Sequence, residues 1–180
     1  MKKKKLITLL IIIPLLFIII GTATVFGLSF ETYSFVDDAM EPTYQKDSSI
    51  TVINWKKKIQ EIKRFDVIVF VMYNDVFISR VIGMPNEIIE LKSEGPNYAL
   101  YINNIYYPED YLETENKNLT CFTVVAEACN GNSTNVTEGN LYVLNDNRSN
   151  VLDSRNGSIT LIPYTAILGV GDYPRFFDIF

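Results

Sequence analysis

The chain has 180 residues, of which 48% are hydrophobic, and it carries 16 basic and 21 acidic side chains, for a formal net charge of −5. It contains no histidine, which excludes Ser-His-Asp triads, Cys-His dyads and most zinc sites. Four of the basic residues are the lysines at positions 2–5. The remaining chain therefore has 12 basic against 21 acidic residues, and its net charge of −9 argues against a nucleic-acid partner.

An almost unbroken apolar run follows these lysines, from Leu6 to Phe26. A helix of about 20 apolar residues spans a bilayer core of roughly 30 Å, and flanking lysines are retained on the cytoplasmic side. The alternative is a cleaved signal peptide, for which residues 22–24 offer small side chains. We expect a single-pass protein of the cell membrane, in contact with the lipid bilayer, with a cytoplasmic tail over 1–5, a transmembrane helix over 6–28 and an extracellular domain over 29–180.

Short runs of β-branched and aromatic residues, bounded by Gly, Pro, Asn and Asp, recur through the extracellular part and predict a mainly β fold. A helical period is visible only around residues 55–62. A loop-rich insertion is expected at about 103–140, with a hairpin near its cysteines. The predicted strands are 33–36, 49–55, 66–71, 77–82, 88–91, 98–102, 122–126, 141–144, 158–161 and 166–170.

The chain has two cysteines, Cys121 and Cys129. Outside a membrane they form a candidate disulfide, which would close a short loop and add about 2 kcal/mol of stability. The alternative is a pair of reduced, buried thiols. Since histidine is absent and no other ligand pattern is visible, we expect neither a metal nor a cofactor.

Four ordered segments resemble the type I signal peptidases, and the resemblance runs from the apolar segment to the carboxyl terminus. It implies a signal-peptidase-like β-sheet or barrel ectodomain behind one transmembrane helix. In that family a serine hydroxyl attacks the scissile carbonyl, a neutral lysine accepts its proton, and hydrogen-bond donors stabilise the oxyanion. The segments are Met40-Glu41-Pro42-Thr43, Arg64 to Phe70, Arg80 to Pro85, and Asp146-Asn147-Arg148 with Asp153-Ser154-Arg155.

The resemblance places different residues at the family's catalytic positions. Ala39 stands where the serine nucleophile is expected, and Ser79 stands where the lysine base is expected. Asp37 replaces a serine that helps to bind the oxyanion, and Val151 replaces the serine that orients the lysine. An alanine has no nucleophilic atom, and a neutral hydroxyl accepts a proton poorly, so the sequence predicts no catalytic residues and no enzyme activity.

The framework of the family is retained. The resemblance implies that Asp146 pairs with Arg80 and that Asp153 pairs with Arg155, in charge-assisted bonds that hold the strands in place. The alternative is an ordinary charged surface turn. Two of the matching segments also contain glycine positions that have changed, to Phe65 and Asn145 in this chain. The structural motif therefore comprises Met40, Pro42, Arg80, Asp146, Arg148, Asp153, Ser154 and Arg155.

The family binds an extended peptide between two strands, which map here to residues 33–36 and 76–78. The candidate peptide groove is formed by Phe35, Val36, Phe77 and Ile78. The alternative is that these side chains fill the core of the sheet.

Three hypotheses for function follow. The first is an inactive, non-enzymatic chaperone-like factor, similar to the signal-peptidase-like pilus assembly proteins of Gram-positive bacteria (SipA type), with pilin subunits and a class C sortase as partners. The second is an active type I signal peptidase that cleaves preproteins with relocated catalytic groups, such as Ser79 or the Asp37–Asp38 pair. The third is a degenerate paralogue without a function. The sequence favours the first.

Overall fold

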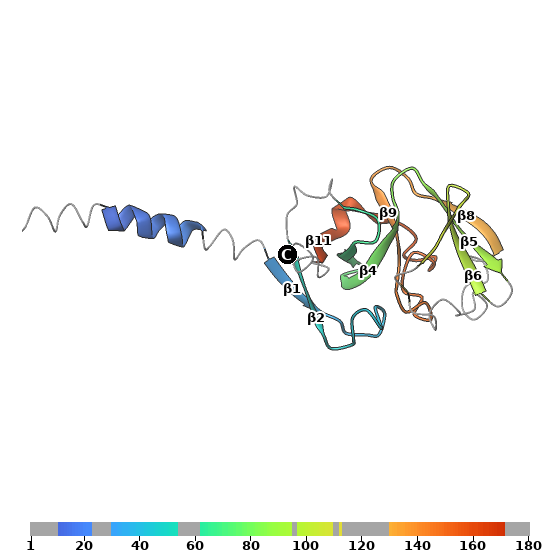
Figure 1. Ribbon diagram of the computed structural model, residues 1–180, viewed down its shortest axis with the longest axis horizontal. Coiled ribbons are helices and arrows are strands. Elements are labelled where there is room, and N and C mark those ends of the chain that lie inside the picture. Colours follow the sequence, from blue (N-terminus) through green and yellow to red (C-terminus); the bar gives the residue numbers. More distant parts are fainter. Residues whose placement is uncertain are drawn as a thin grey trace, which may run out of the picture.

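The computed structural model describes residues 11–22, 30–53, 62–94, 97–109, 112 and 130–171. A helix over residues 11–22 precedes the strands (Figure 1). Within the described residues, no helix has both the length and the apolar character needed to cross a membrane. The cytoplasmic tail over 1–5 lies outside this part of the chain, and the transmembrane segment over 6–28 stays a prediction.

The larger sheet has seven strands in the order β1-β2-β11-β3-β4-β9-β10. Every neighbouring pair in it is antiparallel. β11, the last strand of the described chain, lies between β2 and β3 and pairs with both of them. The strands are β1 (Phe30–Ser34), β2 (Ser49–Ile53), β3 (Val67–Met72), β4 (Asp75–Gly83), β9 (Asn140–Leu144), β10 (Ile162–Pro163) and β11 (Ile167–Gly171). A short 3₁₀ helix, η2 (Tyr164–Ala166), links the last two.

The smaller sheet has four strands in the order β7-β6-β5-β8, at the other end of the strand-bearing part in Figure 1. The turn between β6 and β7 contains Asn103 and Asn104, whose φ angles are 52° and 66°. Two successive positive φ values favour a tight hairpin, and asparagine tolerates them better than most residues. The strands are β5 (Ile88–Glu94), β6 (Asn97–Ile102), β7 (Ile105–Tyr107) and β8 (Asn130–Asn135).

β3 is apolar throughout because it is covered on both faces. Val67 and Val69 point into a cluster with β2, whereas Ile68 and Phe70 point into a second cluster with β9. Alternate residues of a strand face opposite sides, so a continuous apolar run is the pattern of a strand buried on both faces. A third cluster packs the ends of β4 and β9 against β5 and β6 and holds the two sheets together.

The mainly β prediction is confirmed, with three differences in its strands. β1 begins and ends earlier than the predicted strand over 33–36. Residues 158–161 do not form a strand, because Ile159 and Thr160 both donate their N–H groups to the carbonyl of Asn156 in a turn. The short β7 and β10 and the polar β8 were not predicted. The predicted strand over 122–126 and most of the 55–62 helix lie outside the described residues.

The larger sheet does not close on itself, since β1 and β10 are its two edges. The barrel alternative in the predicted fold is therefore not observed in the described part of the chain. At Phe65, which replaces a glycine of the family, φ is 72°. The backbone keeps the left-handed conformation that glycine adopts freely, although a side chain makes it less favourable.

Candidate functional site

A pocket of about 550 Å³ lies between the segment that follows β1 and the start of β4. All four residues of the predicted groove, Phe35, Val36, Phe77 and Ile78, line it. Its size is within the range of roughly 300–1,000 Å³ that is typical of ligand pockets. The other lining residues are Ser34, Asp37, Ala39, Asp75, Val76, Asn145 and Leu152.

The hairpin between β3 and β4 brings the second wall into place. Tyr73 and Asn74 form its turn, with φ angles of 53° and 69°, and β3 and β4 pair in continuous register from Val67 to Met72. Asp75 is the first residue of β4 and its side chain is exposed. The turn thus places a carboxylate at the rim of the pocket, beside the apolar residues that follow it.

Three of the groove residues also belong to the core. Phe35 is 2% exposed and stacks on Tyr44, with 4.8 Å between ring centroids. Phe77 stacks on Phe70 in one hydrophobic cluster, and Ile78 packs against another. Val36, in contrast, is 75% exposed. The two alternatives for these residues are therefore not exclusive, because the same side chains fill the core and form the pocket wall. That a peptide binds there stays a prediction.

The turn from Asp37 to Ala39 is held by one hydrogen bond within it and by others to the loop that follows β9. Asp37 Oδ1 accepts a hydrogen bond of 3.0 Å from the backbone N–H of Ala39. Asp38 Oδ1 accepts one of 3.1 Å from the side chain of Asn150, and its carbonyl accepts one from Asn147. The two carboxylates have separate partners, so the structure does not show Asp37 and Asp38 as a shared acid pair. Ala39, at the family's nucleophile position, is buried and lines the pocket.

Ser79 is not one of the lining residues, but it is hydrogen-bonded to Asn145, which lines the pocket. Its side chain is 1% exposed, and its hydroxyl donates to Asn145 Oδ1 at 2.7 Å. Asn145 lines the pocket and donates from its amide to Asn150 and Leu152. Its φ is not positive, so this position needs no glycine. Val151 is half-buried and is not one of the lining residues, whereas its neighbour Leu152 is.

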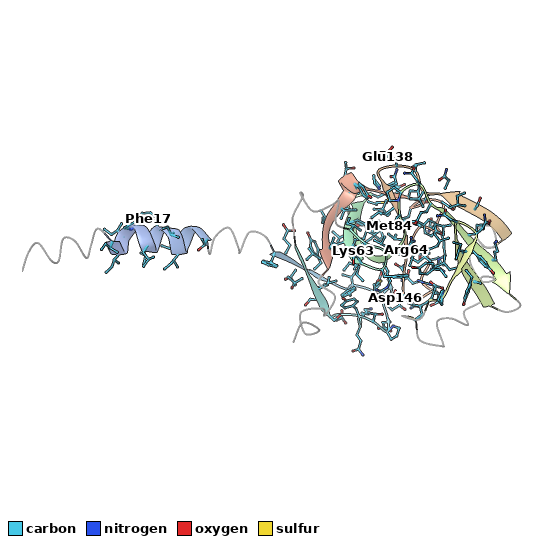
Figure 2. The ribbon with its side chains drawn as sticks, turned by 45° about the horizontal axis from the view of Figure 1, so that its top comes forward. Phe17, Lys63, Arg64, Met84, Glu138 and Asp146 are labelled. Atoms are coloured by element: carbon cyan, nitrogen blue, oxygen red, sulfur yellow. The ribbon has the colours of Figure 1, made fainter. Side chains whose placement is uncertain are left out.

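A buried ion pair ties β4 to the loop after β9. Arg80 donates from Nε to Asp146 Oδ1 at 2.8 Å and from Nη2 to Oδ2 at 2.5 Å, and both side chains are at most 3% exposed. Thr43 donates to the same carboxylate at 2.6 Å, while Arg80 also donates to the carbonyl of Phe65. Figure 2 shows Asp146 among the densely packed side chains of the strand-bearing part. This network fixes the turn around Met40, which is fully buried, against β4.

The second expected ion pair is also present. Arg155 donates from Nε and Nη2 to the carboxylate of Asp153, which accepts the backbone N–H of Asn145 as well. Ser154 exchanges two hydrogen bonds with the backbone of Val143. Asp146 and Asp153 are both fully buried, so these two carboxylates belong to the interior although the loop between them reaches the surface.

Arg148 has a partner that the sequence did not indicate. It forms a buried ion pair with Glu109, two residues beyond β7, and it also donates to the carbonyl of Asn145. The pair connects the end of the smaller sheet to the loop that carries Asn145. Pro42 follows a cis peptide bond and is exposed. Of the pocket residues, Ser34, Asp75 and Leu152 had no signal in the sequence, since their role depends on strand ends that meet only in the fold.

Cys121 and Cys129 lie outside the described residues, so the candidate disulfide stays a prediction. In the described ranges, no three His, Cys, Asp or Glu side chains are grouped to hold a metal ion.

Comparison with known proteins identifies the family. The model of the family described as "Signal peptidase, peptidase S26" matches residues 5–176. A protein named Signal peptidase I from Bacillus licheniformis is 29% identical over 82% of this chain and 77% of its own length. Another of that name from Bacillus amyloliquefaciens is 31% identical over 82% of this chain and 74% of its own. The crystal structure of a signal peptidase I from Enterococcus faecalis covers 61% of this chain and 95% of its own, with 28% identity and a TM-score of 0.46.

These matches correct two expectations drawn from Ala39 and Ser79, namely that the chain is not an enzyme and that it is a pilus assembly factor. The relatives that match most of the chain are named Signal peptidase I, which is the name of an enzyme. The expectations went too far because the absence of the family's serine and lysine removes only those two groups. Other side-chain oxygens still line the pocket. The pilin and sortase partners were inferred from the rejected role and stay untested. The family, matched over residues 5–176, is clear: the chain belongs to the signal peptidases of the peptidase S26 family.

Proposed function

We propose that this protein is a type I signal peptidase that hydrolyses a peptide bond in secreted preproteins, with catalytic groups relocated from the usual family positions. Water supplies the hydroxyl group of the new carboxylate and the proton of the released amine. The observation that carries the proposal is the match over nearly the whole chain to proteins named Signal peptidase I. The pocket between the 34–37 segment and β4 supports it, because its walls come from two extended segments.

The substrate is an extended segment of the preprotein. Val36 and Val76 are exposed at the pocket, and Phe35 and Phe77 provide its deeper apolar surface. A peptide laid along these residues would bury apolar side chains while its backbone remained free to pair with strand edges. The apolar amino terminus supports anchoring in the cell membrane, with the strand-bearing domain on the outer side.

The reaction must use groups other than the family's serine and lysine, because Ala39 and Ser79 stand at those two positions. The oxygens available near the pocket are the hydroxyls of Ser34 and Ser79 and the carboxylates of Asp37, Asp38 and Asp75. Ser79 is the displaced nucleophile that the sequence suggests. Its hydroxyl donates to an amide oxygen and not to a base, so reaction there requires the bond between Ser79 and Asn145 to open.

Cleavage of a preprotein by the purified full-length protein in lipid nanodiscs tests this function. Mass spectrometry of the product gives the cleaved bond, and the Bacillus licheniformis relative serves as the positive control. We expect cleavage that is lost in Ser79→Ala or in Asp38→Asn and retained in Ser158→Ala, which changes an exposed turn. Absence of cleavage by the unmodified protein, with the relative active on the same preprotein, would overturn the proposal.

A further inference from the structure

Among the described residues that line the pocket, two carry a carboxylate and none is basic. Asp37 is half-buried on the wall that follows β1, and Asp75 is exposed on the wall formed by β4. The nearby arginines Arg80 and Arg155 are each paired with a buried carboxylate, Arg80 with Asp146 and Arg155 with Asp153. The cavity is therefore an apolar slot whose two walls each carry a negative charge.

The hydrogen bonding of Asp37 adds a second feature. Its Oδ1 accepts the backbone N–H of Ala39, a buried residue that also lines the pocket. A carboxylate oxygen accepts more than one hydrogen bond, and its other oxygen has no role in that contact. Asp37 thus contributes hydrogen-bond acceptor atoms to the lining of the pocket. A ligand that brings its own positive donor complements it, whereas an anionic ligand is repelled.

From these features we infer that Asp37 and Asp75 select preprotein segments that carry a lysine or arginine side chain. The methylene stem of such a residue packs against Val36 and Val76, and its cationic head reaches the two carboxylates. This inference rests on the proposed function, since it names the class of segment that the same pocket accepts. It assigns the two aspartates a role in specificity and none in the cleavage step.

Peptide binding measures this preference without requiring turnover. The full-length protein, in nanodiscs of phosphatidylcholine without anionic lipid, is titrated with fluorescent extended peptides that differ only in Lys or Gln at one position. We expect the best Lys peptide to bind about fivefold more tightly than its Gln counterpart, which is the ratio for a partly exposed ion pair. The ratio should fall toward one at high salt, because exposed charges are screened.

Two variants assign the preference to the pocket. Asp37→Asn keeps the oxygen that accepts the Ala39 N–H, and Asp75→Asn changes an exposed residue, so both should fold, as circular dichroism will check. The double variant should bind Lys and Gln peptides equally. Glu138→Gln removes the same charge from an exposed site that lies far from Asp146 in Figure 2, and it should keep the preference.

The inference is overturned if the unmodified protein binds Lys and Gln peptides alike, or if the double variant keeps the preference. An equal loss in Glu138→Gln would also overturn it, because the effect would then come from the overall charge of −9 on the extracellular part. Cleavage without a charge preference refutes the inference and leaves the proposed function intact. A preference for Lys peptides without cleavage supports the inference and refutes the proposed function.

Discussion

Replacing Asp146 by alanine removes the acceptor that holds three segments together. The carboxylate receives two hydrogen bonds from Arg80 and one from Thr43. Asp146 is fully buried, and the side chain of Arg80 is 3% exposed. In the variant the guanidinium keeps its bond to the carbonyl of Phe65 but loses its neutralising partner. A buried guanidinium would then lack the carboxylate that accepts two of its hydrogen bonds.

The expected cost follows from this geometry. Breaking a buried ion pair by removing one partner costs about 3–5 kcal/mol, because the remaining charge is left without compensation. For a chain of this length, each kcal/mol lowers Tm by roughly 2–4 °C, so we expect a decrease of about 6–20 °C. Replacing both members, with Arg80→Met and Asp146→Leu, should cost much less than Asp146→Ala alone, since no charge is then stranded.

Thermal and urea unfolding of the full-length protein in detergent, followed by circular dichroism, gives these values. Glu138→Ala is the matched control, because it removes an exposed carboxylate and should change the free energy of unfolding by no more than about 0.5 kcal/mol. If Asp146→Ala costs less than about 1 kcal/mol, or if the double variant is worse than the single one, the ion pair does not hold these segments as described.

Three further outcomes are expected. Gly83→Ala should lower the free energy of unfolding by about 1–3 kcal/mol in urea titrations, because the added Cβ would lie 2.8 Å from Ile89 in a packed cluster; an unchanged midpoint would contradict this. Glu109→Ala should cost about 3–5 kcal/mol by the same assay, since it removes the carboxylate that pairs with the buried Arg148, and restoring stability with Arg148→Met would support the pairing. Burial, with a hydrogen-bonded carboxylate, raises the pKa of Tyr33 from 10.0 to about 12, so its contribution to stability is complete below pH 10 and is lost between pH 10 and 12. Absorbance titration of the unmodified protein and Tyr33→Phe should show that this ring ionises late.

Much of the strand pattern was visible in the sequence. β3 and β4 were predicted nearly to their ends, since apolar runs bounded by turn residues are a strong local signal. β8 was missed because its sequence, NGNSTN, is polar and resembles a loop. It is a strand because β5 offers it backbone partners, which is a tertiary effect that overrides local preference. The turn at 158–161 was missed for the converse reason, since its β-branched residues favour a strand.

The sequence by itself determined the mainly β fold and the order of the segments that match the family. It also identified four of the apolar residues that line the pocket, because a family resemblance carries the positions of aligned strands. Only the tertiary structure decided what surrounds them. Asp37 and Asp75 are 38 positions apart and meet at one cavity because the 34–37 segment and the β4 hairpin end beside each other. Such a meeting depends on how strands are ordered in a sheet, and no local pattern of residues contains it.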